Sequence, residues 1–245
     1  MTKGKLAEMP MVVGDGIRFA ADLALHGLAS LPAALVFFWL WGLGAWWARL
    51  IAFAAAYAAL AAAFPLAVLL FAVILVRKVS PGTYPLRSRE AARWIAAESL
   101  VILVHRSFLR GYLEDFGLPR RLYHRCLGAK IGRNFFVGGE ARILDPWALE
   151  VGDNALVGAF SVIAGHVIEG DNITVKPVRI GAGATIGMRS VVLPGVRVGV
   201  GSIVGAGALV AKDTIIPDGE VWAGVPARKI GEVAMGQPES GGARL

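Results

Sequence analysis

The feature that most constrains the fold is a six-residue repeat in the C-terminal half of the chain. Aliphatic residues recur there at strict steps of six: Ile180, Ile186, Val192, Val198, Val204, Val210 and Ile216. A helix repeats every 3.6 residues and a half-buried strand every two, so neither gives this period. The repeat therefore predicts a parallel β-helix, in which successive coils stack and bury one aliphatic column.

The repeat fails at two places. Earlier hexads begin at Ile131, Val137 and Ile143, slip by two residues near "PWALE", and restart at Val151, Val157 and Ile163. The register then breaks over residues 165–179. A closely packed coil tolerates such residues only outside its stack, so we expect a loop with His166 at its root. His166 is the only histidine in residues 131–245.

The N-terminal part is rich in uncharged apolar residues. Hydrophobic residues make up 56% of the chain, and Arg49 is the only charge between Asp22 and Arg77. Residues 23–48 and 50–76 are each long enough to cross a hydrocarbon core. They predict an α-helical transmembrane hairpin, and the flanking Lys and Arg residues place both termini in the cytoplasm. The predicted location is a bacterial-type inner (cytoplasmic) membrane, with a multi-pass protein whose repeat domain faces the cytoplasm.

A basic segment separates this hairpin from the repeat. Residues 77–133 carry twelve Lys and Arg against four Asp and Glu, and most of the net charge of +7 arises there. The proline-free run around Trp94 predicts amphipathic helices at a membrane interface, bound to anionic headgroups of membrane lipids. No nucleic-acid partner is expected, since no base-stacking or groove-entering pattern accompanies the charge.

These patterns predict four parts. They are an N-terminal segment with two transmembrane helices (1–80), basic amphipathic interfacial helices (81–130), a β-helix (131–231) and a flexible C-terminal tail (232–245).

The repeat region also resembles a known family. The stretches "LPGV", "GAGALVAKD" and "GVPARKI" within residues 177–231 are similar to the closing coils of left-handed β-helix hexapeptide-repeat acyltransferases. The preceding "LYHRCLGAKIGRN" resembles the domain entry of membrane-attached members, such as capsule-type sugar acetyltransferases and the C-terminal region of poly-amino-acid synthetases. The resemblance implies a homotrimer, acetyl-CoA or another acyl-CoA as donor, and an active site in a groove between neighbouring subunits.

His166 matches the catalytic histidine of that family in residue and position. An imidazole can accept the proton of a hydroxyl or amine while the nucleophile attacks a thioester. Glu140 stands where soluble sugar acetyltransferases carry a substrate-contacting Asn. Glu140 and Asp145 are candidates for acceptor binding or for orienting His166, and both could equally be solvated corner residues.

The resemblance also implies a donor site. By position, Gly187, Gly205 and Ala206 would contact the pantetheine arm of CoA through their backbone. Three cations match basic positions near the CoA phosphates, or could merely be solubilising residues: Lys212, Arg228 and Lys229.

Two other functions use the same fold. A non-catalytic trimeric membrane scaffold would not cleave a thioester. A γ-carbonic-anhydrase-like enzyme needs three histidine ligands for zinc, and the repeat region offers one, so no metal is expected. The predicted function is therefore transfer of an acetyl or short acyl group to a hydroxyl or amine. The expected acceptor is a membrane-associated glycan, lipid or peptide, and the choice between oxygen and nitrogen stays open.

Overall fold

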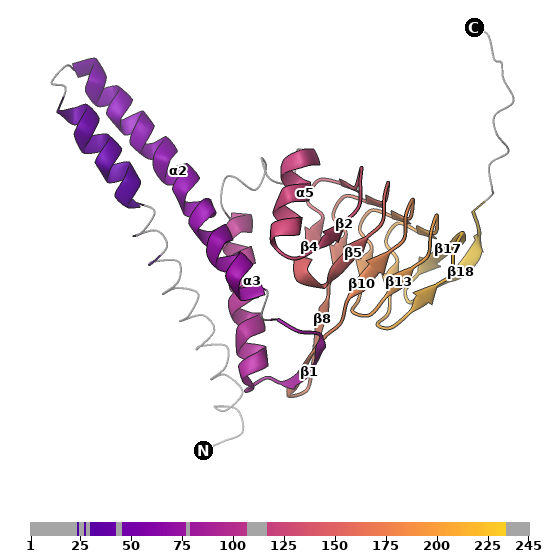
Figure 1. Cartoon of the computed structure of the whole chain (residues 1–245). Helices are drawn as coiled ribbons and strands as arrows, with labels where there is room; N and C mark the ends of the chain where they lie inside the picture. The colour runs from indigo at the N-terminus through magenta and orange to yellow at the C-terminus, as the bar shows by residue number, and fades with distance from the viewer. Residues whose placement is uncertain are drawn as a thin grey trace, which may run out of the picture. The chain divides into compact units, whose positions relative to one another are not determined.

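The computed structural model describes residues 24, 27, 30–42, 46–76, 79–106 and 117–233. Its main element is a stack of short strands that runs from Lys130 to Glu232 (Figure 1).

The strands form three sheets, to each of which successive coils contribute one strand. The first contains β2 (Lys130–Ile131), β5 (Leu149–Val151), β10 (Val178–Ile180), β13 (Arg197–Val198) and β16 (Ile215–Ile216). The second contains β3 (Phe136–Val137), β6 (Leu156–Val157), β11 (Thr185–Ile186), β14 (Ile203–Val204), β17 (Glu220–Gly224) and β18 (Ala227–Glu232). The third contains β4 (Arg142–Ile143), β7 (Val162–Ile163), β12 (Val191–Val192) and β15 (Leu209–Val210).

The aliphatic position of every hexad lies in the interior, from Ile131 to Ile216. The small residues four positions later are buried too: Ala184, Ser190, Val196, Ser202 and Ala208. Parallel pairing places each hexad over the hexad one coil later in the chain, which is 18 residues later in the Ile186–Val204 pair. The parallel β-helix is therefore confirmed, and the three sheets fit the predicted left-handed form. Within these three sheets, the final pair, β17 and β18, is antiparallel.

The residues predicted to form a loop after Gly165 are instead a β-hairpin. Strands β8 (His166–Glu169) and β9 (Asn172–Val175) pair antiparallel across a two-residue turn, where Gly170 has a φ of 59°. Glycine adopts this left-handed conformation without steric cost. A third strand, β1 (Gly82–Pro85), pairs with β9 and comes from the segment before the repeat. Strand β1 was not predicted, because four residues carry almost no periodic signal.

The slip at "PWALE" has a simple structural cause. Residues Pro146–Ala148 form a single 3₁₀ turn, η1, between β4 and β5. Asp145 precedes this turn, but its side chain makes no capping hydrogen bond to it. The carboxylate is therefore available for other contacts.

The described residues before the repeat are mainly helical. They contain helices α2 (Trp46–Val76), α3 (Arg89–Arg106) and α5 (Gly117–Cys126), together with a further helical stretch over residues 30–41. Over the described part of the chain, no helix combines the length and the apolar character that crossing a membrane requires. The predicted transmembrane hairpin is not supported, and the predicted multi-pass location in an inner membrane is wrong. That prediction was drawn from the lack of charges over residues 23–76, and a lack of charge alone does not establish a membrane crossing.

The apolar face of α3 packs inside the protein. Trp94 and Ala91 are buried in a core cluster with Ala148 of η1 and with Ile173 and Val175 of β9. Partly buried neighbours complete this cluster: Val79, Tyr84, Leu86, Ile95 and Trp147. Trp94, which was expected at a membrane interface, is thus a core residue. Three stretches that entered the predictions lie outside the described residues: 1–23, 107–116 and the tail from residue 234 on.

The chain divides into two compact units. The first, called here the helical unit, contains Met1–Ile131, Leu144–Leu149 and Gly165–Pro177. The second, the coil unit, contains Gly132–Ile143, Glu150–Ala164 and Val178–Leu245. The two stretches where the hexad repeat fails therefore belong to the same unit as α3 and β1.

Candidate active site

His166 and Asp145 are in direct contact in the helical unit. Nδ1 of His166 lies 2.6 Å from Oδ2 of Asp145. The side chain of Asp145 is fully buried and that of His166 is 18% exposed. The structure therefore supplies a histidine that reaches solvent and is backed by a carboxylate that does not.

Both oxygens of Asp145 accept hydrogen bonds. The backbone N–H of Gly165 donates to Oδ2 at 2.8 Å, and the indole Nε1–H of Trp94 donates to Oδ1 at 2.8 Å. A buried carboxylate is tolerated only when its oxygens are satisfied in this way. Because a carboxylate can only accept, the proton of the neutral imidazole lies on Nδ1. Nε2 is then the nitrogen with a free lone pair, as a general base requires.

Gly165 is required by close packing at this point. A Cβ atom on Gly165 would lie 2.7 Å from Cβ of Ala148 and 2.9 Å from Cβ of Asp145. Both neighbours are buried. Only glycine therefore lets β8 begin close enough to η1 for the His166–Asp145 contact to form.

Trp94 is a site residue that the sequence did not reveal. Its buried ring lies 4.3 Å from the ring of His166, centroid to centroid, with 55° between the planes. The sequence placed Trp94 on an amphipathic helix but assigned its apolar face to lipid. No local pattern links residue 94 to residues 145 and 166, so the contact could not be found from spacing.

The residues predicted to bind the donor lie in the coil unit. A Cβ on Gly187 would fall 2.5 Å from the backbone nitrogen of Ala206, so Gly187 packs directly on the Gly205–Ala206 turn of the next coil. The Gly187 N–H donates to the carbonyl of Val204, which continues the ladder between β11 and β14. The structure thus brings the three predicted pantetheine contacts together at one corner.

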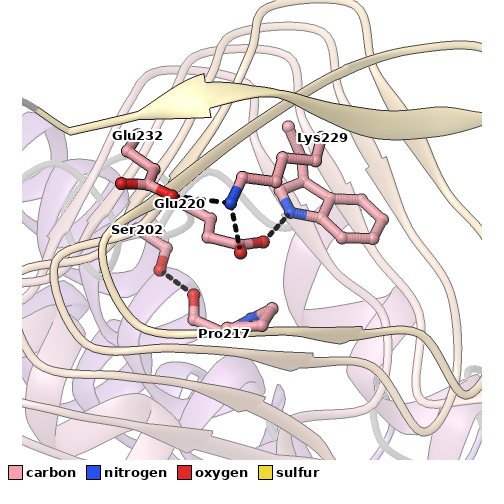
Figure 2. Close-up of polar contacts among 6 residues, drawn as sticks. Ser202, Pro217, Glu220, Lys229 and Glu232 are labelled. Atoms are coloured by element: carbon pink, nitrogen blue, oxygen red, sulfur yellow. Dashed lines mark hydrogen bonds and ion pairs between the residues drawn. The ribbon is translucent and has the colours of Figure 1, made fainter.

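The three predicted phosphate-binding cations have different surroundings. Lys212 is exposed in the turn after β15. Arg228 begins the exposed part of β18 and donates from Nη1 to the carbonyl of Ala227. Lys229 donates from Nζ to Glu220 and Glu232, at 2.8 Å each (Figure 2). The charge of Lys229 is therefore compensated within the protein.

The hydrogen bond between Lys229 and Glu220 shifts both groups. It is the largest cause that lowers the pKa of Glu220 below its usual value, with a smaller contribution from the indole N–H of Trp222. The same bond is the largest cause that raises the pKa of Lys229. The pair holds β17 to β18 at the end of the coil stack.

Figure 2 also shows Ser202, whose hydroxyl donates to the carbonyl of Pro217 at 2.6 Å.

Glu140 lies in the coil unit and does not form part of the His166–Asp145 pair. It occupies the exposed turn after β3 with a φ of 58°, a conformation uncommon outside glycine and asparagine. Over the described residues, no group of three or more His, Cys, Asp or Glu side chains is placed to hold a metal ion.

Residues 177–212 match the family model described as bacterial transferase hexapeptide (six repeats). No match is found among curated protein sequences. A maltose O-acetyltransferase from Clostridium difficile 630 is similar in structure, with 22% identity, a TM-score of 0.48, and coverage of 64% of this chain and 95% of that one.

Two further solved structures are similar to this chain. A galactoside acetyltransferase in complex with coenzyme A has 20% identity and a TM-score of 0.42 over 62% of this chain and 87% of that one. A mutant of AntD, an N-acyltransferase from Bacillus cereus in complex with dTDP and coenzyme A, has 21% identity and a TM-score of 0.38. That match covers 40% of this chain and 60% of AntD.

Proposed function

We propose that this protein is an acyltransferase that moves an acetyl or short acyl group from acyl-CoA to a hydroxyl or amine, with His166 as general base. The observation that carries the proposal is the 2.6 Å contact between His166 and a fully buried Asp145. The hexapeptide-transferase match over residues 177–212 supports the same class of reaction. Glycans, lipids and peptides all offer suitable hydroxyl or amine groups.

The chemistry follows from the two nitrogens of His166. Nε2 takes the proton from the acceptor hydroxyl or amine as the acceptor atom attacks the thioester carbonyl of the donor. Asp145 holds the Nδ1–H and balances the charge of the imidazolium that forms. When the carbon–sulfur bond of the tetrahedral intermediate breaks, the imidazolium returns its proton to the departing thiolate. The products are the acylated acceptor and free CoA, and no covalent enzyme intermediate is needed.

For the donor, we propose that the corner of Gly187, Gly205 and Ala206 contacts the pantetheine arm of CoA. Lys212, Arg228 and Lys229 are the proposed partners of its phosphates. Of the three, Lys229 would have to exchange two carboxylate contacts for a phosphate, so we expect it to contribute least. Glu140 remains a proposed acceptor contact. We further propose that the protein acts as a homotrimer, the assembly implied by the resemblance of residues 177–231.

The test is acyl transfer by the purified full-length chain, supplied with acetyl-CoA and a panel of hydroxyl and amine acceptors. Release of free thiol gives the rate, and mass spectrometry identifies the product. We expect His166→Ala to lower kcat by ~10²- to 10⁴-fold, the usual contribution of a general base. Ile168→Ala is the matched control, because Ile168 is exposed on the same strand.

Two results would contradict the proposal. Equal rates for His166→Ala and the unmodified protein would remove the catalytic role of the histidine. Absence of any thiol release with every acceptor would favour a non-catalytic scaffold.

A further inference from the structure

Trp94 contacts both members of the His166–Asp145 pair. Its Nε1–H donates to Oδ1 of Asp145 at 2.8 Å, and its ring lies 4.3 Å from the imidazole ring. Trp94 is 7% exposed and comes from α3, more than fifty residues before Asp145 in the sequence. Trp94, which lies outside the repeat, thus contacts Asp145 and His166, the two residues at the interruptions of the repeat.

The hydrogen bond fixes the rotation of the carboxylate. Oδ2 of Asp145 accepts from Gly165 and faces His166, whereas Oδ1 accepts from Trp94. Without Trp94, Oδ1 would be a buried oxygen that has lost this donor, and such an atom is costly to leave unsatisfied. The carboxylate would then gain by turning about its Cβ–Cγ bond toward another donor. Such a turn would move Oδ2 away from Nδ1 of His166.

The ring fixes the orientation of the imidazole in a different way. It occupies the space beside His166 at van der Waals distance, so the imidazole cannot swing toward α3. The ring is itself held in place by Ala91 on its own helix, Ala148 in η1, and Ile173 and Val175 on β9. These neighbours are all buried. The position of Trp94 is therefore set by packing and does not depend on Asp145 alone.

We propose that Trp94 is a positioning residue for acyl transfer: it acts through Asp145 to hold His166 in the orientation from which Nε2 can take the acceptor proton. This inference rests on the proposed function of His166. It makes α3, together with its partner strand β9, part of the catalytic apparatus of the chain.

The test is Trp94→Phe in the full-length protein, a change that keeps an aromatic ring but removes the N–H donor. Trp147→Phe is the matched control. Trp147 belongs to the same core cluster, and its buried Nε1 has no acceptor within the described part of the chain. Both variants lose one indole N–H, but only Trp94→Phe removes a hydrogen bond to the carboxylate.

We expect Trp94→Phe to lower kcat by ~10- to 100-fold, as loss of a hydrogen bond to a charged group does, with KM for acyl-CoA changed by less than ~2-fold. Trp147→Phe should keep kcat within ~2-fold of the unmodified protein. If Trp94→Phe unfolds, site-specific incorporation of benzothienylalanine at position 94 keeps the ring shape and replaces the N–H by sulfur. The same loss of kcat is expected for it.

A spectroscopic readout separates positioning from a general loss of structure. A proton shared over 2.6 Å between the imidazole and the carboxylate gives a strongly downfield ¹H NMR signal, which can be assigned by its absence in His166→Ala. We expect the signal to shift or broaden in Trp94→Phe and to stay in place in Trp147→Phe.

Equal kcat values for the two Trp variants, or an unmoved signal in Trp94→Phe, would overturn the role of Trp94. If His166→Ala is inactive in the same assay, the proposed function survives that outcome. If His166→Ala is fully active, the proposed function itself fails.

Discussion

The close packing at Gly165 allows a quantitative prediction for Gly165→Ala. The φ of Gly165 is not in the left-handed region, so the backbone accepts alanine and the cost is steric. The new Cβ would lie 2.7 Å from Cβ of Ala148 and 2.9 Å from Cβ of Asp145. Carbon atoms pack best at about 3.5–4.0 Å, so the contacts are too short by at least ~0.8 Å and ~0.6 Å.

Neither neighbour can yield by a side-chain rotation, because both atoms are attached directly to the backbone. The 3₁₀ turn or the start of β8 must shift, and overpacking of this kind costs about 1–3 kcal/mol. For a protein of this length, we expect the Tm to fall by about 3–10 °C. The same shift separates Asp145 from His166, and a misplacement approaching ~1 Å at a reacting group can lower kcat by ~10²-fold.

The assays are thermal unfolding followed by circular dichroism and thiol release from acetyl-CoA. Gly231→Ala is the control, because a Cβ there meets nothing within 4 Å and the φ of Gly231 is ordinary. It should change stability by less than about 1 kcal/mol and leave kcat unchanged. An unchanged Tm in Gly165→Ala would refute the packing argument. A lowered Tm with full activity would show that the position of Asp145 does not control His166.

Two further predictions concern the coil unit. The pKa of Glu220 is lowered, chiefly by its hydrogen bond from Lys229. The ionised Glu220 side chain therefore stabilises the folded protein at neutral pH. This stabilisation is lost as the pH falls below about 4.5 and through the pKa that Glu220 has in the folded protein. The Tm of Glu220→Gln should therefore lie below that of the unmodified protein at about pH 7 and converge with it in acid; a constant difference would contradict this. For the proposed donor site, Lys212→Ala should raise KM for acyl-CoA by roughly 2- to 5-fold without changing kcat. Arg197→Ala is the control, because it removes an exposed cation on β13; it should change neither KM nor kcat.

The coil could be predicted from the sequence because its determinants are local. Each hexad from Ile180 to Ile216 places one aliphatic residue in the interior, so the recurrence over neighbouring hexads suffices to assign the strands and their buried face. The two interruptions of the repeat were equally visible. What each interruption contains was not, since a 3₁₀ turn at Pro146–Ala148 and a hairpin at residues 166–175 both appear in the sequence simply as missing periodicity.

The site was only partly predictable because its contacts join distant segments. His166 was predicted from the break in the repeat and from the family resemblance, and Asp145 was predicted to bind the acceptor, to orient His166 or to be a solvated corner residue. The structure shows that Asp145 is buried and contacts Nδ1 of His166. Strand β1 pairs with β9 across about ninety residues, and Trp94 reaches Asp145 across fifty-one. Pairings of this kind depend on packing in three dimensions, which a single sequence does not reveal. The membrane prediction failed for a related reason: a count of charges carries no information on the arrangement of the helices.

The way the repeat is broken accounts for the position of the proposed base, His166. Inside a regular coil, a side chain either points into the narrow interior or lies on a flat face whose neighbours repeat in every coil. Neither environment can bury a carboxylate and leave an adjacent imidazole partly exposed. Asp145 and His166 escape this restriction because each lies in an interruption, and both interruptions belong to the same compact unit as α3. Trp94 then supplies an indole N–H to Asp145, whereas the inward hydroxyls of the repeat, such as those of Ser190 and Ser202, donate to backbone carbonyls. The chemistry of the proposed site therefore depends on the segments that depart from the repeat.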